Sequence, residues 1–106
     1  MICVKLFRSE QGARGFAVSG HAGYADAGQD IVCAAVTSAV QLTANAITEV
    51  LSVDAEVGQS EATITLSLSE SQRNEKTDAF LQAFALHISL LAESYPQAIS
   101  YSYLEV

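Results

Sequence analysis

The spacing of apolar residues changes period along the chain, and these changes limit the possible folds more than any other sequence feature. Near the N-terminus, Ile2, Val4 and Leu6 alternate with residues that would face the other way, which is the period of a β-strand. The turn-forming sequence SEQGARG follows, and residues 16–19 alternate again. Residues 1–19 are therefore predicted to form a β-hairpin.

Two longer segments have the helical period instead. The first covers residues 30–51, with Asp30 as the expected N-cap. Its main buried face is predicted to contain Ile31, Ala35, Ala39, Leu42, Ala46 and Val50, widened by Val32, Val36, Val40 and Ile47.

The second helix is predicted to begin at Ser71 or Asn74 and to end at Ser94, shortly before the single proline, Pro96. Its expected core stripe consists of Phe80, Phe84, Leu91 and Tyr95, broadened by Leu81, Leu86, Ile88 and Leu90.

Alternating residues elsewhere predict three further strands. Residues 53–57 and 62–68 form a second candidate hairpin around GQSE, and residues 99–105 form a last strand. The resulting order, ββαββαβ, predicts an α+β fold in which two helices pack on a mostly antiparallel sheet. We expect residues 1–106 to form a single domain.

Charge limits the partners that such a domain can bind. Twelve acidic and five basic residues give a formal net charge of −7. This balance disfavours direct binding to nucleic acid or to an anionic membrane surface, whereas a basic protein partner is compatible with it. Half of the residues are apolar and only 16% are charged, so part of the apolar surface is expected to meet a partner, most simply in a homodimer.

Two cysteines, Cys3 and Cys33, provide neither a disulfide framework nor the spacing of a zinc site, and no metal or cofactor is expected. The N-terminal apolar run is too short for a signal peptide, and no stretch is expected to approach the roughly 18 uncharged apolar residues of a membrane helix. These features predict a cytoplasmic protein with reduced thiols and no membrane contact.

The stretch GHAGYADAGQDIVC contains the residues best suited to chemistry. If Asp30 is the N-cap, Cys33 lies in the first helical turn, where unpaired backbone N–H groups favour the thiolate. His21 begins the preceding loop and is a candidate general base for that thiol. Gly20, Gly23 and Gly28 permit unusual backbone angles, which suits a loop that closes over an extended peptide.

Other interpretations of these residues stay open. A cysteine among small apolar residues is commonly part of a core, and a phosphate-binding role for the glycines is disfavoured because no lysine follows them. Asp30 is expected to cap the helix in preference to orienting His21. His87 is expected to be a buried or interface histidine.

The second cysteine and two tyrosines near the C-terminus are weaker candidates for a functional role. Cys3 is predicted to lie in the core or on the sheet surface. Tyr101 and Tyr103 are candidates for a peptide groove or for a subunit interface.

Residues 20–22, GHA, and residues 28–36, GQDIVCAAV, together resemble the signature of the Prp family of ribosomal-processing cysteine proteases. In that signature a GHA is followed by a short variable loop and then by G-x-DIVCAAVS. Thr37 stands here in place of the usual serine and keeps a hydroxyl group. The length and the order of elements fit as well, so the resemblance covers essentially the whole chain.

The resemblance implies a homodimeric cysteine endopeptidase that removes a short N-terminal extension from ribosomal protein bL27, cutting after an aromatic pair. It further implies that Cys33 is the nucleophile, that His21 is the general base and that Asp30 and Thr37 are supporting residues. The alternative is a non-catalytic dimeric module that binds a basic ribosomal protein segment. A redox thiol protein is disfavoured because the chain has no C-x-x-C motif.

Overall fold

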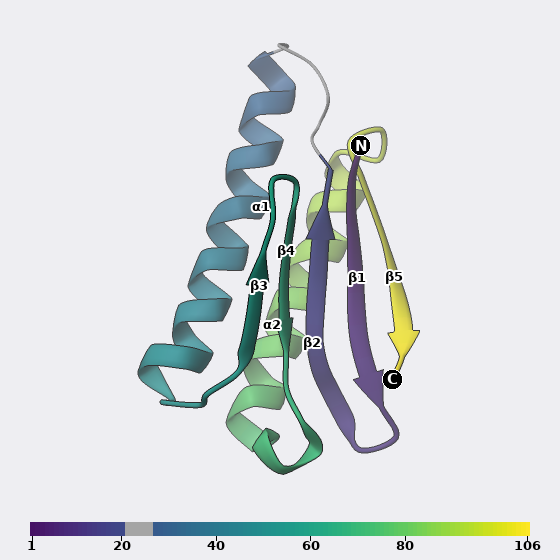
Figure 1. Ribbon diagram of the computed structural model, residues 1–106. Coiled ribbons are helices and arrows are strands. Elements are labelled where there is room, and N and C mark those ends of the chain that lie inside the picture. The colour runs from purple at the N-terminus through teal and green to yellow at the C-terminus, as the bar shows by residue number, and fades with distance from the viewer. Residues whose placement is uncertain (21–26) are drawn as a thin grey trace.

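The computed structural model describes residues 1–20 and 27–106, and for residues 27–30 only the backbone (Figure 1). The elements follow the predicted order, with two short additional helical turns, and the five strands form one sheet. They are β1 (Ile2–Ser9), β2 (Gly12–Ser19), α1 (Ala27–Asn45), a π-helical turn (Ala46–Val50), β3 (Glu56–Gln59), β4 (Thr63–Ser67), a 3-10 turn (Glu70–Gln72), α2 (Glu75–Ser94) and β5 (Ile99–Glu105).

The sheet has the strand order β3-β4-β2-β1-β5. All neighbours are antiparallel except β1 and β5, which are parallel because α2 carries the chain back across the sheet. In β1, Ile2, Val4 and Leu6 are buried whereas Cys3 and Lys5 are exposed, so the helices cover one face of the sheet (Figure 1). The predicted α+β fold and its mostly antiparallel sheet are confirmed.

The core fills the space between this sheet face and the two helices. Phe16 of β2 packs against Phe84 of α2 with ring centroids 4.6 Å apart, and both side chains are buried. Asn74 caps α2, since its side chain accepts hydrogen bonds from the backbone N–H groups of Lys76 and Thr77. Of the two predicted starts of this helix, the one at Asn74 is confirmed.

The predicted main face of the first helix is only partly correct, because Ala46 is buried whereas Ile31, Leu42 and Val50 are exposed. Val32, Val36, Val40 and Ile47, which were predicted only to widen that face, are its most deeply buried side chains, and Thr43 is also buried. Ile31 and Leu42, which were expected to be buried, are 63% and 71% exposed. Because α1 carries apolar residues on nearly all sides, the period of its sequence could not determine which side faces the sheet.

The predicted core stripe of α2 is partly wrong for the same reason. Phe84, Leu81 and Ile88 are buried as expected, and Thr77, which is not part of the predicted stripe, is buried with them. The remaining residues of the predicted stripe are exposed or half-buried. His87 is exposed, which excludes the buried interpretation of this residue and leaves the interface one.

The segment Ile31–Val50 corrects another expectation from the sequence, because it has the length and apolar composition of a membrane-crossing helix. These criteria are weak evidence for a membrane span, since the core helix of a soluble protein also meets them. Here 33% of the most apolar window is buried inside the protein, along the face that contains Val32, Val36 and Val40.

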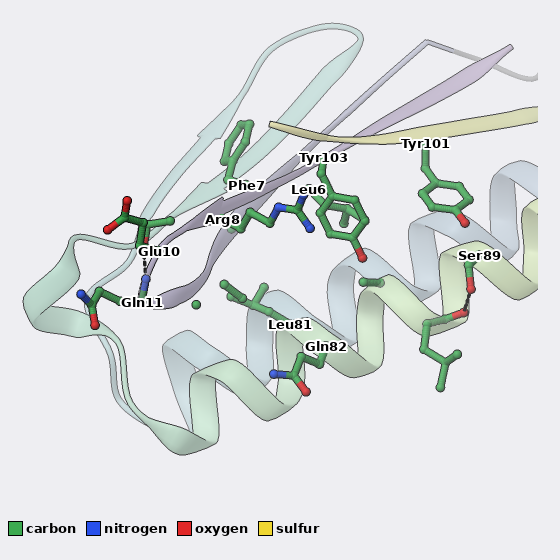
Figure 2. Close-up of a pocket in the computed structure, with 16 residues that line it drawn as sticks. Leu6, Phe7, Arg8, Glu10, Gln11, Leu81, Gln82, Ser89, Tyr101 and Tyr103 are labelled. Atoms are coloured by element: carbon green, nitrogen blue, oxygen red, sulfur yellow. Dashed lines mark hydrogen bonds between the residues drawn. The ribbon is translucent and has the colours of Figure 1, made fainter. Parts of the chain in front are cut away.

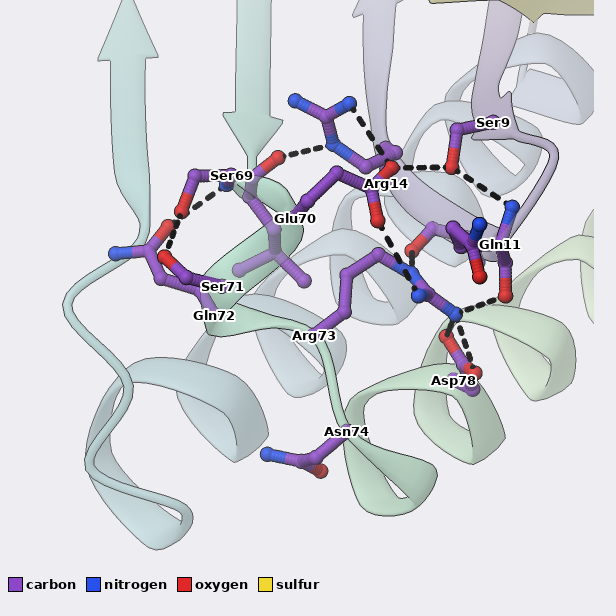
Figure 3. Close-up of polar contacts among 12 residues, drawn as sticks. Ser9, Gln11, Arg14, Ser69, Glu70, Ser71, Gln72, Arg73, Asn74 and Asp78 are labelled. Carbon is purple, nitrogen blue, oxygen red and sulfur yellow. Dashed lines mark hydrogen bonds and ion pairs between the residues drawn. The ribbon is translucent and has the colours of Figure 1, made fainter.

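A polar network connects the start of α2 to the β1–β2 turn (Figure 3). The guanidinium of Arg73, whose side chain is only 11% exposed, donates to both carboxylate oxygens of Asp78 at 2.9 and 2.8 Å. It also donates to the backbone carbonyl groups of Gln11 and Ala13. This network fixes the end of the sheet that is remote from the N-terminus.

Glu70 extends the network and makes stability depend on pH. Its carboxylate accepts a hydrogen bond from the Ser9 hydroxyl and pairs with Arg73 and Arg14. The hydrogen bond from Ser9 has the largest effect and lowers the pKa of Glu70. Desolvation opposes it, but the charges of Arg73 and Arg14 add to the lowering, so the pKa stays below its ordinary value of 4.5. A carboxylate whose pKa is lower in the folded than in the unfolded state stabilises the fold at neutral pH, and this contribution is lost as the pH falls through the folded-state pKa.

We therefore expect Glu70→Gln to be less stable than the parent protein at pH 7 and to approach it in stability as the pH falls below 4.5. Urea unfolding at a series of pH values measures this difference. Glu10→Gln, which removes another exposed carboxylate, is the control for net charge. A stability difference between Glu70→Gln and the parent that is constant from pH 7 to pH 3 would contradict the assignment.

Candidate active site

A cavity of about 170 Å³ lies at the end of the sheet where β2 ends, and three parts of the fold form it. The strands contribute the apolar side chains of Ile2, Val18 and Ile64. Helix α1 contributes Cys33, Val36 and Thr37. The remaining lining residues are Gly20 and the β3–β4 turn, residues 59–63. The cavity thus brings together three residues singled out from the sequence: Gly20, Cys33 and Thr37.

Cys33 is half-buried and packs against the core. It does not lie in the first turn of its helix, as expected, because α1 begins at Ala27 and Cys33 is its seventh residue. The predicted N-cap role of Asp30 is therefore wrong, since Asp30 lies inside the helix. The effect of unpaired N–H groups on an anion is largely confined to the first turn, so the helix start alone does not account for an activated thiol at position 33.

Gly28 is also helical, which shortens the predicted loop of residues 20–29 by three residues. Ala27 and Gln29 are good helix formers, and the uninterrupted helix that follows extends upstream through them. The cost of about 1 kcal/mol relative to alanine applies to a glycine in a helix interior, whereas Gly28 is the second residue of this helix.

His21 and Gly23 lie outside the described residues. The residue directly before His21 is nevertheless well placed, since Gly20 lines the same cavity as Cys33. The described chain therefore reaches the wall of the Cys33 cavity at the residue directly before His21.

Gly20 fits its position because it has no side chain. Its φ is +85°, a region that other residues rarely adopt, and a Cβ atom would lie 2.5 Å from the carbonyl oxygen of Met1. Its N–H donates to the carbonyl oxygen of Ala62 at 3.1 Å. Gly20 thus holds the exit of β2 against both the N-terminus and the β3–β4 turn.

The β3–β4 turn is the part of the site that the sequence analysis missed. The sequence GQSE indicated a hairpin turn, but no local signal places that turn beside Cys33. The pairing of β4 with β2 brings it there, with Thr63 opposite Ser19. Such pairing between distant segments cannot be read from the turn itself.

A larger cavity, of about 550 Å³, lies at the opposite end of the sheet between β1, β5 and α2 (Figure 2). Tyr101 and Tyr103 line it, so these residues are remote from Cys33 and do not form a peptide groove beside it. The Arg8 guanidinium lies 4.2 Å from the centre of the Tyr103 ring and pairs with Glu105. The described residues that line this cavity include neither a cysteine nor a histidine, so the smaller cavity, which contains Cys33, is the candidate site of the chemistry.

Within the described part of the chain, no group of three or more histidine, cysteine or acidic residues is arranged to hold a metal ion. A half-buried thiol at the wall of a small cavity is a candidate nucleophile, and Gly20, the residue before His21, lines the same cavity. Comparison with known proteins gives the family. The model of the family described as cysteine protease Prp matches residues 1–100, so the chain belongs to this family and is a cysteine protease.

Solved structures have the same fold. SMU.848 from Streptococcus mutans is 27% identical, with a TM-score of 0.90 over 100% of this chain and 96% of that one. Two structures of the essential ribosomal processing protease Prp from S. aureus each cover 98% of this chain and 100% of their own. The one with a covalently linked product peptide is 21% identical with a TM-score of 0.86, and the one with a substrate peptide is 20% identical with a TM-score of 0.87. Among curated protein sequences, none matches this chain.

The close approach at Gly20 predicts that Gly20→Ala destabilises the protein and impairs its peptidase activity. The added Cβ meets a backbone atom, and the residue must keep a positive φ, which together cost about 1–3 kcal/mol. Thermal unfolding and peptide hydrolysis measure the two effects. Gly58→Ala is the matched control, because its Cβ meets only the Thr65 side chain, which can rotate away. Equal stability of Gly20→Ala and the parent would contradict this role of Gly20.

Proposed function

We propose that this protein, as a single domain of residues 1–106, removes a short N-terminal extension from ribosomal protein bL27 by cutting after an aromatic pair. Cys33 is the nucleophile and His21 the general base. The observation that carries the proposal is that Cys33 and Gly20, the residue before His21, line one cavity. Membership of the cysteine protease Prp family supports it, as does the fold shared with the S. aureus ribosomal processing protease.

The proposed reaction follows from the chemistry of a thiol and an imidazole. His21 takes the thiol proton, and the Cys33 thiolate attacks the carbonyl carbon of the scissile peptide bond. The imidazolium then donates its proton to the leaving amine as the C–N bond breaks, which leaves a thioester on Cys33. His21 then takes a proton from a water molecule, which attacks the thioester carbonyl. The C–S bond breaks, the carboxylate product leaves, and the proton on His21 restores the Cys33 thiol.

The two supporting residues have separate proposed roles. Thr37 lies one helical turn after Cys33 and lines the cavity, so its hydroxyl group is available to a bound peptide. Asp30 lies one turn before Cys33 on the same helix. Since it does not cap the helix, we assign it the other role considered for it, which is to orient the imidazole of His21.

A non-catalytic module that binds a basic ribosomal segment would have the same fold and the same acidic charge. The two functions differ in one outcome, because only the protease converts the peptide into two products. Family membership favours the protease.

We expect a synthetic peptide that spans the bL27 extension to be cleaved once, after the aromatic pair. Cys33→Ala should abolish the cleavage, and His21→Ala should slow it by about 10²–10⁴-fold, as for the loss of a general base. Cys3→Ala is the control, because Cys3 is exposed on the sheet face away from the helices. Mass spectrometry of the peptide before and after incubation gives the result, and persistent cleavage by Cys33→Ala would contradict the mechanism.

We further propose that the protein is a homodimer in the cytoplasm, where its thiols stay reduced. The surface proposed for the dimer is a groove of about 520 Å³ between α1 and α2. Leu42 and Phe80 line it with His87, and Leu86 and Leu90 of α2 are also exposed. Exposed apolar side chains on two neighbouring helices are typical of a subunit interface.

Sedimentation at micromolar concentration should then give about twice the monomer mass of 11.2 kDa. Leu42→Asp should shift the protein to monomer, because it places a charge in the groove. Leu104→Asp, on the sheet face opposite to the helices, should leave the dimer intact. A parent protein that sediments only as a monomer would refute the dimer.

A further inference from the structure

The turn between β3 and β4 forms one wall of the Cys33 cavity, and two hydrogen bonds fix its position. The Ser60 N–H donates to the Thr63 carbonyl oxygen at 2.8 Å and closes the turn. The Gly20 N–H donates to the Ala62 carbonyl oxygen at 3.1 Å and holds the turn against the end of β2. Glu61, between these two anchors, therefore has a defined place beside the cavity.

Glu61 differs from its surroundings in charge. Among the described residues that line this cavity, it is the one with an ionisable carboxylate, and the strands beneath contribute the apolar side chains of Ile2, Val18 and Ile64. On the α1 side, the polar lining residue Thr37 is uncharged. Glu61 is exposed, so its carboxylate stays solvated and available to a ligand.

The size of the cavity determines where a peptide substrate must lie. Its volume of about 170 Å³ is well below the roughly 300–1,000 Å³ of sites that enclose a whole small molecule. An extended peptide is too large to be enclosed in this volume, so we infer that the residues flanking the scissile bond pass along the rim. The rim includes Glu61, whose field acts over about 8 Å at physiological ionic strength.

We propose that Glu61 is a specificity-determining residue of this protease. Its carboxylate favours peptides with a lysine or arginine within a few residues of the scissile bond and disfavours peptides with an acidic residue there. This inference rests on the proposed function, because it requires that peptides are cleaved at Cys33.

A local effect of Glu61 must be separated from the net charge of −7, which attracts any cationic peptide. Glu56 offers a matched control. It is an exposed glutamate of the same hairpin, at the other end of β3, and it does not line the cavity. Glu56→Lys and Glu61→Lys change the net charge equally, so a difference between them reports the position of the charge.

The experiment uses peptides that contain the bL27 extension and differ at one flanking position, which is lysine, glutamine or glutamate. Substitutions at successive positions on both sides of the scissile bond locate the effect. The parent enzyme should cleave the lysine peptide with a kcat/KM about two- to fivefold above that of the glutamine peptide, the range expected for an exposed ion pair, and the glutamate peptide less well again. Glu61→Gln should bring the three values together, Glu61→Lys should reverse their order, and Glu56→Lys should keep the parent order.

Each contrary result has a distinct meaning. If the parent cleaves the peptides but shows no preference at any flanking position, or if Glu61→Lys keeps the parent order, the role of Glu61 is refuted while the proposed function stands. If Glu56→Lys changes the order as much as Glu61→Lys, the preference belongs to the net charge, and the role of Glu61 is again refuted. If no peptide is cleaved by the parent, the proposed function fails and this inference fails with it. Thermal unfolding of each variant establishes that the compared proteins are folded.

Discussion

The burial of one face of α1 is the interaction on which the site depends. Val32, Val36 and Val40 recur at intervals of four residues, and all three side chains are buried in the core. Full burial of a side chain of this size stabilises the fold by about 1.5–3 kcal/mol, so the helix cannot rotate without losing several such contributions. Cys33 follows Val32 directly and is therefore held at the edge of the buried face, where it meets the ends of the strands.

Gly20 forms the part of the Cys33 cavity wall that lies at the end of β2. Its lack of a side chain lets the end of β2 approach the N-terminus, and its N–H binds the β3–β4 turn. Four distant parts of the sequence thus meet around one small cavity: the start of β1, the end of β2, the second turn of α1 and a hairpin turn. The network of Arg73, Asp78 and Glu70 connects elements at the opposite end of the sheet (Figure 3).

Local patterns in the sequence were sufficient for the number of strands, the order of elements and the cap at Asn74, but the strand predicted at residues 53–57 lies at Glu56–Gln59. Alternation in β1 correctly assigned Ile2, Val4 and Leu6 to one face, since only one side of this strand is apolar throughout. The helical period predicted too wide a buried face for α1, since it included both Val36, which is buried, and Leu42, which is exposed. The predicted helix start at Asp30 was also wrong. A residue that is well suited to an N-cap does not mark the start of a helix when the residues before it can also be helical.

For the site, the sequence motif identified Cys33, Thr37 and Gly20, which the fold brings to one cavity, but gave no indication of Glu61. Glu61 reaches the cavity through the pairing of β4 with β2, which joins residues more than 40 positions apart. Because α1 starts at Ala27, Cys33 lies in its second turn. The N–H groups at the helix start therefore contribute little to stabilising the Cys33 thiolate, and the proposed activation of the thiol depends mainly on His21.

The most direct test of this account is the rate at which iodoacetamide alkylates each thiol as a function of pH. Alkylation requires the thiolate, and an ordinary thiol is only a few per cent ionised at pH 7. Exposure alone would make Cys3 react faster, because Cys3 is exposed and Cys33 is half-buried. We predict the opposite order near neutral pH, with Cys33 slowed by His21→Ala and largely restored at high pH. Labelling of Cys33 that is slower than that of Cys3 and unaffected by His21→Ala would contradict the assignment of Cys33 and His21 as nucleophile and base.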